Sequence, residues 1–311
     1  MLAYLLLPVG LVILMFGGDW LVKGASGLAL KLNVPAVVIG LTIVAIGTSA
    51  PELVISLDAA LIGAGGIAVG NVVGSNIANV LLVLGLPALI APLAAPRDRL
   101  HVTLAFLVVA TLLFMWLMAT GSLERSAGLV LVLLLILFLV LQFRAARNGH
   151  AADLSDEVGD LPAETWKLVA YLVVGLSALP LGAKLTVDAA VAIARALSVS
   201  DEVIGLTIVA IGTSLPELAT TVSAARAGTT SVAMGNVIGS NMFNIAAIMG
   251  ITVLVQPVPV GPHIIGFDMW VMAGATAFLV VVALAGFRLG RRVGGLLLAA
   301  YLAYLVVTVL I

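Results

Sequence analysis

Two glutamates stand in nearly identical surroundings at distant points of the chain. Glu52 lies in GLTIVAIGTSAPEL, residues 40–53, and Glu217 lies in GLTIVAIGTSLPEL, residues 205–218. In each copy a threonine, a serine and a proline precede the carboxylate inside an otherwise apolar run. Carboxylates and hydroxyls are hard oxygen ligands, which suit Ca²⁺ or Na⁺ and do not suit Zn²⁺ or Cu⁺. The chemistry that these residues could do is the reversible binding of hard cations.

A second duplicated stretch follows each glutamate at the same distance. GNVVGSNIAN covers residues 70–79 and GNVIGSNMFN covers residues 235–244, so that one offset of 165 residues aligns both motifs without a gap. About 25 of the 46 positions in this alignment are identical. Glycines spaced four apart favour close packing of membrane helices, and that explanation would suffice if the acids were absent. Hydroxyls and amides spaced four apart share one helical face, as in the pairs Ser75 with Asn79 and Ser240 with Asn244.

Composition places these motifs in a membrane. Hydrophobic residues make up 63% of the 311-residue chain, charged residues make up 9%, and the mean hydropathy is +1.28. A water-soluble surface could not be built from such a sequence, so we predict a polytopic membrane protein. The run 2–16 has no basic residue before it and no cleavage site after it, which favours a retained first span over a signal peptide. The net charge of −1 argues against nucleic acid as a partner, and the absence of cysteine removes disulfides and thiolate metal sites.

The elements that must position the motifs are apolar stretches of about 20 residues or more, the length that a bilayer requires. There are ten of these stretches, five in each half of the chain. Because five is an odd number, the second half begins on the opposite side of the membrane from the first. We therefore predict an all-α integral membrane protein of ten transmembrane helices, arranged as two inverted five-helix repeats with broken core helices. The repeats are expected at 1–143 and 167–311, with a polar cytoplasmic linker at 144–166. The ten spans are expected near 2–30, 34–62, 66–91, 100–120, 123–143, 167–197, 202–225, 230–256, 264–286 and 292–311.

Basic residues in the loops predict the orientation. One side of the membrane has only Arg125 and Arg195, and the cytoplasmic side is expected to be the richer one. This places both termini outside and predicts a multi-pass protein of the plasma (inner) membrane. The richer side holds Lys31, Arg97, Arg99, Arg144, Arg147, Lys167, Arg226, Arg288, Arg291 and Arg292.

Each half also holds one pair of opposite charges within its first span. Asp19 and Lys23 are four residues apart, and the 165-residue offset places them over Lys184 and Asp188, with the signs exchanged. Such a pair can neutralise itself within one helix, either simply as an ion pair at headgroup level or as part of gating. Asp58 has no acidic counterpart because Ser223 aligns with it, and we expect it at the end of a span or in a vestibule.

The sequence before each glutamate predicts a broken helix. Pro51 removes an amide donor and Gly47 lowers helix stability, and the second copy has the same pair of residues. We expect the break to free backbone carbonyls, for example those of Ala45 and Ala210. An ionised glutamate at this depth costs several kcal/mol unless it is compensated. The duplicated cores contain no basic side chain except Arg226 near a span end, so a bound cation is the expected partner.

The paired motifs GTSAPE with GNVVGSNIAN and GTSLPE with GNVIGSNMFN resemble the two alpha repeats of the sodium/calcium exchanger family, of the prokaryotic type, within the calcium/cation antiporter superfamily. The resemblance implies that the second, third, seventh and eighth spans form the ion-binding core, past which the first and sixth spans slide. Proton-coupled relatives usually have GN before the glutamate, so Gly47-Thr48 and Gly212-Thr213 favour Na⁺. Asn244 replaces an Asp of some members, which weakens any case for K⁺. The implied ligands are Ala45 (carbonyl), Thr48, Ser49, Glu52, Ser75, Asn79, Ala210 (carbonyl), Thr213, Ser214, Glu217, Ser240 and Asn244.

The leading functional hypothesis is therefore antiport of Na⁺ against Ca²⁺ by alternating access, with the family stoichiometry of about three Na⁺ for one Ca²⁺. The expected partners are these ions and the lipid bilayer, with no resident cofactor, and a monomer would suffice. An H⁺/Ca²⁺ exchanger on the same scaffold is the nearest alternative, because a buried carboxylate also binds a proton. A passive cation channel is a third. An intramembrane aspartyl protease is disfavoured because the only Gly-Asp sequence, at Asp19, has Lys23 one turn later.

Overall fold

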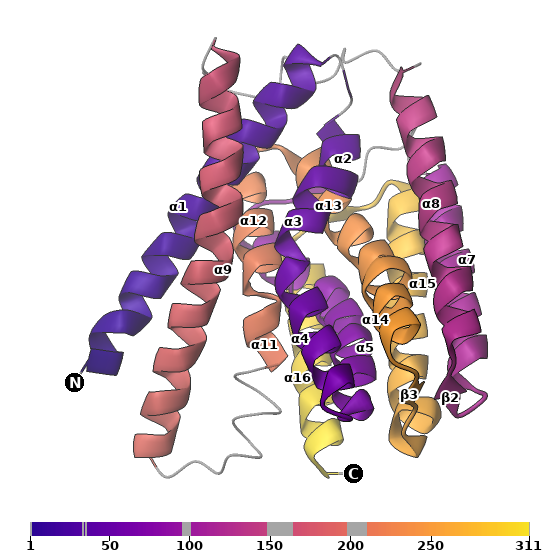
Figure 1. The fold of residues 1–311 in the computed structure, drawn as a ribbon. Helices are drawn as coiled ribbons and strands as arrows, with labels where there is room; N and C mark the ends of the chain where they lie inside the picture. Colours follow the sequence, from indigo (N-terminus) through magenta and orange to yellow (C-terminus); the bar gives the residue numbers. More distant parts are fainter. Residues whose placement is uncertain are drawn as a thin grey trace.

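The computed structural model describes residues 2–32, 34, 36–94, 101–147, 164–197 and 210–310, and it is almost entirely helical (Figure 1). Eight of its helices are long and apolar enough to cross a membrane, and a ninth span is the bent pair Gly40–Thr48 and Ala50–Leu61. The tenth is described in part, by two helices at the 165-residue offset from that pair. The predicted all-α fold with broken core helices is confirmed. Most of the predicted linker, 148–163, and the segment 201–209 lie outside the described residues, as do Arg97 and Arg99.

The first half contains five spans, of which the second and third are interrupted. The bounds are α1 (Leu2–Lys31); α2 (Ala36–Ile39), the π-helix η1 (Gly40–Val44), α3 (Ala45–Thr48) and α4 (Ala50–Leu61); α5 (Gly65–Leu81) and α6 (Gly85–Ile90); α7 (His101–Met118); and α8 (Arg125–Arg147). Two short strands, β1 (Leu93–Ala94) and β2 (Ser122–Leu123), flank α7.

The second half repeats this order. Its described elements are α9 (Thr165–Ala196); α11 (Ala210–Thr213) and α12 (Leu215–Arg226); α13 (Thr230–Phe243), the π-helix η3 (Asn244–Met249) and α14 (Gly250–Val255); the π-helix η4 (Ile264–Asp268) and α15 (Met269–Ala285); and α16 (Arg291–Leu310). The strands β3 (Val258–Pro259) and β4 (Arg288–Leu289) flank the span formed by η4 and α15.

The strand pairing relates the two halves by a pseudo-two-fold axis. By sequence offset, β1 corresponds to β3 and β2 corresponds to β4. In space β1 pairs with β4 and β2 pairs with β3, both antiparallel. The first strand of each half therefore pairs with the second strand of the other half. The registers also correspond once one extra residue before β4 is allowed for, because Leu93 lies opposite Leu289 and Val258 lies opposite Leu123. The halves therefore exchange places under one rotation, as inverted repeats require.

Both chain ends lie at the end of the molecule that also carries the turn 62–64 after α4 (Figure 1). We call this end the terminal face, and we call the other end, which carries the turn 227–229 after α12, the opposite face. α1 runs from the terminal face to the opposite face, and α9 runs alongside it in the reverse direction. Gly10 of α1 lies against Gly182, whereas Gly24 lies against Leu172, so the numbers fall in α9 as they rise in α1.

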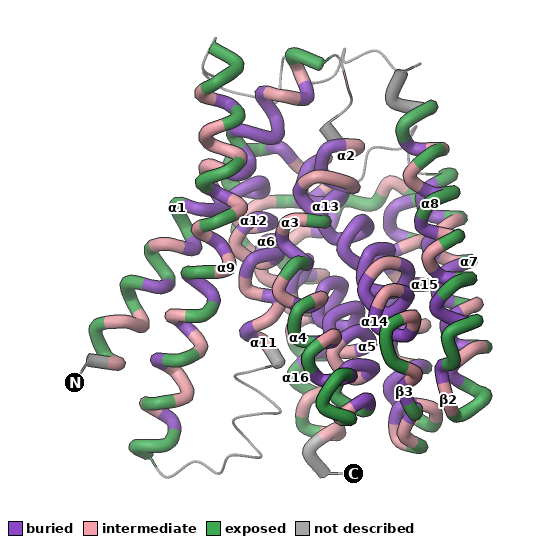
Figure 2. Tube along the Cα trace, in the orientation of Figure 1, coloured by how far each residue is buried: buried purple, intermediate pink, exposed green. Residues whose placement is uncertain are grey.

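α5 and α13 are mostly buried at the centre of the molecule (Figure 2), whereas α1, α9 and α16 expose many of their apolar residues. Two glycines let the second and eighth spans touch at the backbone. A Cβ at Gly239 would come within 2.8 Å of the Leu41 carbonyl oxygen, and a Cβ at Gly40 within 2.9 Å of the Val232 carbonyl oxygen. Small residues at such contacts are how membrane helices approach closely. This contact brings the two duplicated stretches together.

Candidate ion-binding site

The helix break predicted before each glutamate is present. Between Gly40–Thr48 and α4 the axis bends by 49°. Ser49 stands at the bend with φ −86° and ψ 7°, and Ser214 has φ −86° and ψ 5°. Pro51 and Pro216 take the second positions of α4 and α12, where a proline needs no amide donor.

The expectation that the break frees the Ala45 carbonyl is wrong. That oxygen accepts the Ser49 amide at 3.0 Å. The carbonyl that loses its donor is instead the one four residues before Pro51, at Gly47, because proline has no amide hydrogen. The second half differs. The Ser214 amide donates to the Ile211 carbonyl at 3.1 Å, one residue past Ala210.

The two glutamates lie in the first turns of α4 and α12, each with 1% of its surface exposed. The Ser49 hydroxyl donates to Glu217 Oε1 at 2.9 Å, which joins the break of one half to the carboxylate of the other. Ser49 is three residues before Glu52, so this bond brings the two carboxylates into one site, where two ionised carboxylates repel each other. A helix N-terminus partly offsets that repulsion because its dipole favours negative charge. The duplicated motifs therefore form one buried site.

Two asparagines that the sequence analysis missed hold the glutamates in place. Asn71 Nδ2 donates to the Glu52 carbonyl at 3.1 Å and to Ser56 Oγ at 2.9 Å. Asn236 Nδ2 donates in the same way to the Glu217 carbonyl at 3.3 Å and to Thr221 Oγ1 at 3.1 Å. Both asparagines follow the first glycine of their GNV motif, and that shared position was the signal that could have identified them.

The remaining predicted ligands come from the helices around the two breaks. Asn79 Nδ2 donates to Asn241 Oδ1 at 3.0 Å and so joins α5 to α13. The Thr48 hydroxyl lies 3.4 Å from the Ala45 carbonyl and 3.3 Å from Asn236 Oδ1. Ser75, Ser240 and Asn244 are buried in the third and eighth spans, Asn244 begins η3, and Ala210 and Thr213 are the ends of α11.

Several buried oxygens of this group have no hydrogen-bond partner among the described residues. A buried polar atom without a partner costs about 1 to 3 kcal/mol, so such a set calls for a ligand. The described residues contain no group of three or more His, Cys, Asp and Glu, so hydroxyls and amides would have to complete the coordination of the two carboxylates. The unpartnered oxygens from the predicted set are Glu52 Oε2, Asn79 Oδ1, Ser214 Oγ, Glu217 Oε2, Ser240 Oγ and Asn244 Oδ1.

The predicted charge pairs differ between the halves. Lys184 Nζ lies 3.0 Å from Asp188 Oδ2, and both side chains are exposed. Within the part of the chain that the structure describes, no ion pair joins Asp19 to Lys23. Asp58 is exposed near the end of α4, as expected of a residue at a span end or in a vestibule.

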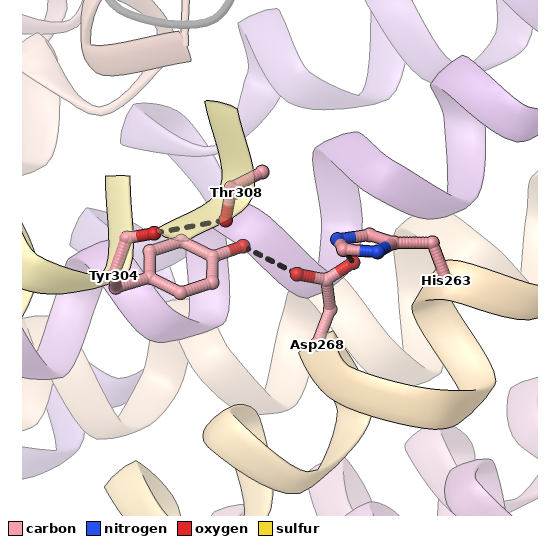
Figure 3. Close-up of polar contacts among 4 residues, drawn as sticks. All are labelled: His263, Asp268, Tyr304 and Thr308. Atoms are coloured by element: carbon pink, nitrogen blue, oxygen red, sulfur yellow. Dashed lines mark hydrogen bonds and ion pairs between the residues drawn. The ribbon is translucent and has the colours of Figure 1, made fainter. Parts of the chain in front are cut away.

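A second polar cluster lies in the ninth and tenth spans (Figure 3). The Tyr304 hydroxyl donates to Asp268 Oδ1 at 3.0 Å, and His263 Nε2 lies 3.5 Å from Asp268 Oδ2. Asp268 is 6% exposed and ends the π-helix η4. At the equivalent position of the first half, Gln142 Nε2 donates to the Thr103 hydroxyl.

The sequence pattern of the family described as "Sodium/calcium exchanger protein" matches residues 2–144 and 167–310. The chain belongs to the sodium/calcium exchanger family. It is 40% identical to the putative antiporter CaxA of Alkalimonas amylolytica over 98% of both chains. It is 37% identical to the sodium/calcium exchanger MaX1 of Methanosarcina acetivorans, over 98% of this chain and 97% of the relative.

Solved structures agree with this membership. The chain superposes on the sodium-calcium exchanger NCX_Mj with a TM-score of 0.83, at 34% identity and over 97% of both chains. Other structures of that exchanger were obtained after soaking with Na⁺ and Ca²⁺ or with Na⁺ and Sr²⁺. The present chain is thus a multi-pass membrane protein of a family of cation exchangers, which are transporters.

Proposed function

We propose that this exchanger moves Na⁺ and Ca²⁺ in opposite directions through one site between Glu52 and Glu217. The observation that carries the proposal is the bond from Ser49 to Glu217, because it brings both duplicated motifs to one buried place. The proposed ligands are the twelve residues named from the sequence, with the Ala45 carbonyl using its second lone pair because it already accepts the Ser49 amide: Ala45, Thr48, Ser49, Glu52, Ser75, Asn79, Ala210, Thr213, Ser214, Glu217, Ser240 and Asn244. The unpartnered oxygens among them support this assignment.

Charge explains why such a site would exchange ions. One Ca²⁺ matches the two carboxylates in charge, and three Na⁺ exceed them by one. Since both ions would use Glu52 and Glu217, they cannot be bound together. An ion-free site would leave two repelling carboxylates within the membrane, which is costly, so the structural transition proceeds most easily when ions are bound.

The Na⁺ coupling is supported by Thr48 and Thr213 before the glutamates, and by the sodium/calcium exchangers among the relatives. The test is uptake of radioactive Ca²⁺ into proteoliposomes driven by an outward Na⁺ gradient. Glu52→Gln and Glu217→Gln should each abolish uptake, because each removes one of the two shared charges. Glu124→Gln, the same change at an exposed turn, should leave uptake intact and serves as the matched control. Retained uptake in both core variants would remove the carboxylates from the mechanism.

Two further conditions in the same assay separate the alternatives. Uptake driven by a pH gradient in Na⁺-free buffer would identify an H⁺/Ca²⁺ exchanger. Uptake without any counter-ion would identify a passive channel. For a 3:1 exchanger, a membrane potential that is negative inside should slow Ca²⁺ uptake, because each turnover then carries one net positive charge out of the vesicle.

A further inference from the structure

α1 packs closely against α12 on the opposite-face half of the molecule. A Cβ at Gly18 would come within 2.8 Å of the Ala219 carbonyl oxygen and of the Ser223 hydroxyl. Ser223 is accordingly only 3% exposed, and Thr220 is fully buried. The two backbones are therefore in direct contact at this point, which closes this face of α12.

The equivalent face of α4 is uncovered. By the 165-residue offset, Val54 corresponds to Ala219 and Asp58 corresponds to Ser223. Val54 is 66% exposed, and Asp58, four residues later on the same side of the helix, is exposed as well. The halves thus keep their two-fold relation at the centre and break it at the edge, where one core helix is covered and the other is open toward the terminal face.

The inverted repeat allows the contact in the other state to be derived. This step rests on the proposed exchange function, which requires the closed and open sides to exchange roles. Ala183 corresponds to Gly18, so in the other state Ala183 of α9 would lie against Val54 and Asp58. The next residue is Lys184, whose long flexible stem lets its charge reach sideways.

We propose that Lys184 and Asp58 form an ion pair when α9 closes over α4, and that this pair seals the terminal face in the alternate state. Lys184, which contacts Asp188 at 3.0 Å in the present state, would then lie between two carboxylates. The ion pair would hold the terminal face closed in the alternate state, which the buried ion site does not do by itself.

The ion pair replaces a close backbone contact that α9 cannot make with α4. Gly18 permits the 2.8 Å backbone approach of α1 to α12, whereas the methyl group of Ala183 would prevent an equally close approach of α9 to α4. One closure therefore relies on a glycine and the other on opposite charges. The unmatched Asp58 and the charge order Lys184 before Asp188 both follow from this arrangement.

The absence of cysteine from the chain permits a direct test of proximity. The double variant Asp58→Cys/Lys184→Cys is reconstituted and treated with a short bifunctional thiol reagent during Na⁺-driven Ca²⁺ uptake. We expect a cross-link that stops uptake, and recovery of uptake when the link is cleaved, while each single variant stays unlinked and active. Failure to link during active transport overturns the proposal.

Charge exchange provides a second test in which the fold is not at risk, because both side chains are exposed. Asp58→Asn should lower turnover about two- to fivefold, the effect of losing a partly exposed ion pair, with little change in KM for Ca²⁺. Asp58→Lys should lower it further, and Asp58→Lys/Lys184→Asp should restore it. If the double variant is no better than the single one, the ion pair is refuted. Loss of uptake in Glu52→Gln would still support the central site, so the two ideas fail separately.

Discussion

The segments before Glu52 and before Glu217 have almost the same backbone and different side-chain partners. Ser49 and Ser214 agree within 2° in φ and ψ, and Asn71 and Asn236 make the same pair of hydrogen bonds. Yet Ser49 donates to Glu217, whereas the Ser214 hydroxyl has no partner among the described residues. The backbone and the two supporting asparagines keep the two-fold symmetry of the repeats, whereas the hydrogen bonds of the two serine hydroxyls differ.

The same contrast holds farther from the site. α12 is covered by α1 at Ser223, whereas α4 is open at Asp58. A buried site between two equivalent halves has no preferred side of its own. Under the proposed exchange function, the first span of each half would decide which face of the membrane the site communicates with, and the core would stay nearly unchanged between states.

A large loss of Ca²⁺ affinity is expected from removing the asparagine supports of either half. Asn236→Ala loses two donated bonds and the bond accepted from Thr48, whereas Asn71→Ala loses two. Buried hydrogen bonds of this kind are worth about 1 kcal/mol each. We expect KM for Ca²⁺ to rise about tenfold or more in Asn71→Ala and further in Asn236→Ala, measured by uptake into proteoliposomes.

Asn76→Ala is the matched control for these variants. Asn76 is buried in the same helix as Asn71, but its amide donates only to Val72 of its own helix. It should lower the melting temperature without a comparable rise in KM. Equal KM changes in all three variants would mean that the asparagines serve packing alone.

A difference between the halves is also expected at the two serines at the bends. Ser49→Ala removes a proposed ligand together with its bond to Glu217, and Ser214→Ala removes a proposed ligand only. The bond to a carboxylate is worth about 1.5 to 3 kcal/mol. Ser49→Ala should therefore weaken Ca²⁺ binding, measured by isothermal titration calorimetry in detergent, about tenfold more than Ser214→Ala does. Equal losses would show that the two hydroxyls are equivalent in solution.

The sequence predicted those features that the repeat and the local backbone determine. The constant offset between the motifs implied two equivalent halves, and Pro51 implied the bend at Ser49. The carbonyl that loses its amide donor could also have been found in the sequence, because it lies four residues before Pro51, at Gly47, but Ala45 was named instead. The sequence could not give the partners of Asn71, since a contact between neighbouring helices depends on their rotation about their axes and leaves no spacing in the chain.

The cluster around Asp268 shows the same limit more clearly. Thr103 and Asp268 are 165 residues apart, as the repeat requires, but their partners Gln142 and Tyr304 are 162 apart. The two helices meet one turn away from the expected position, so alignment of the halves does not bring the partners together. α8 and α16 begin 166 residues apart, so Tyr304 corresponds to Phe138, and the residue that supplies the partner in the first half, Gln142, lies one turn later.

The smallest effect on transport is expected at this cluster. Tyr304→Phe leaves the Asp268 carboxylate without its hydroxyl donor, and Gln142→Leu leaves the Thr103 hydroxyl without its amide donor. We expect both variants to lower the melting temperature. Tyr304→Phe should have the larger effect because its acceptor is a carboxylate, and it should lower the free energy of unfolding by about 1 to 3 kcal/mol. KM for Ca²⁺ should stay within about twofold, since neither bond involves a core helix.

Thr308→Ala, which loses only a bond to the Tyr304 carbonyl of its own helix, is the control and should change neither value appreciably. A change in Ca²⁺ KM without a change in melting temperature would instead make the ninth and tenth spans part of the exchange site, and the contrast between core and edge would have to be redrawn.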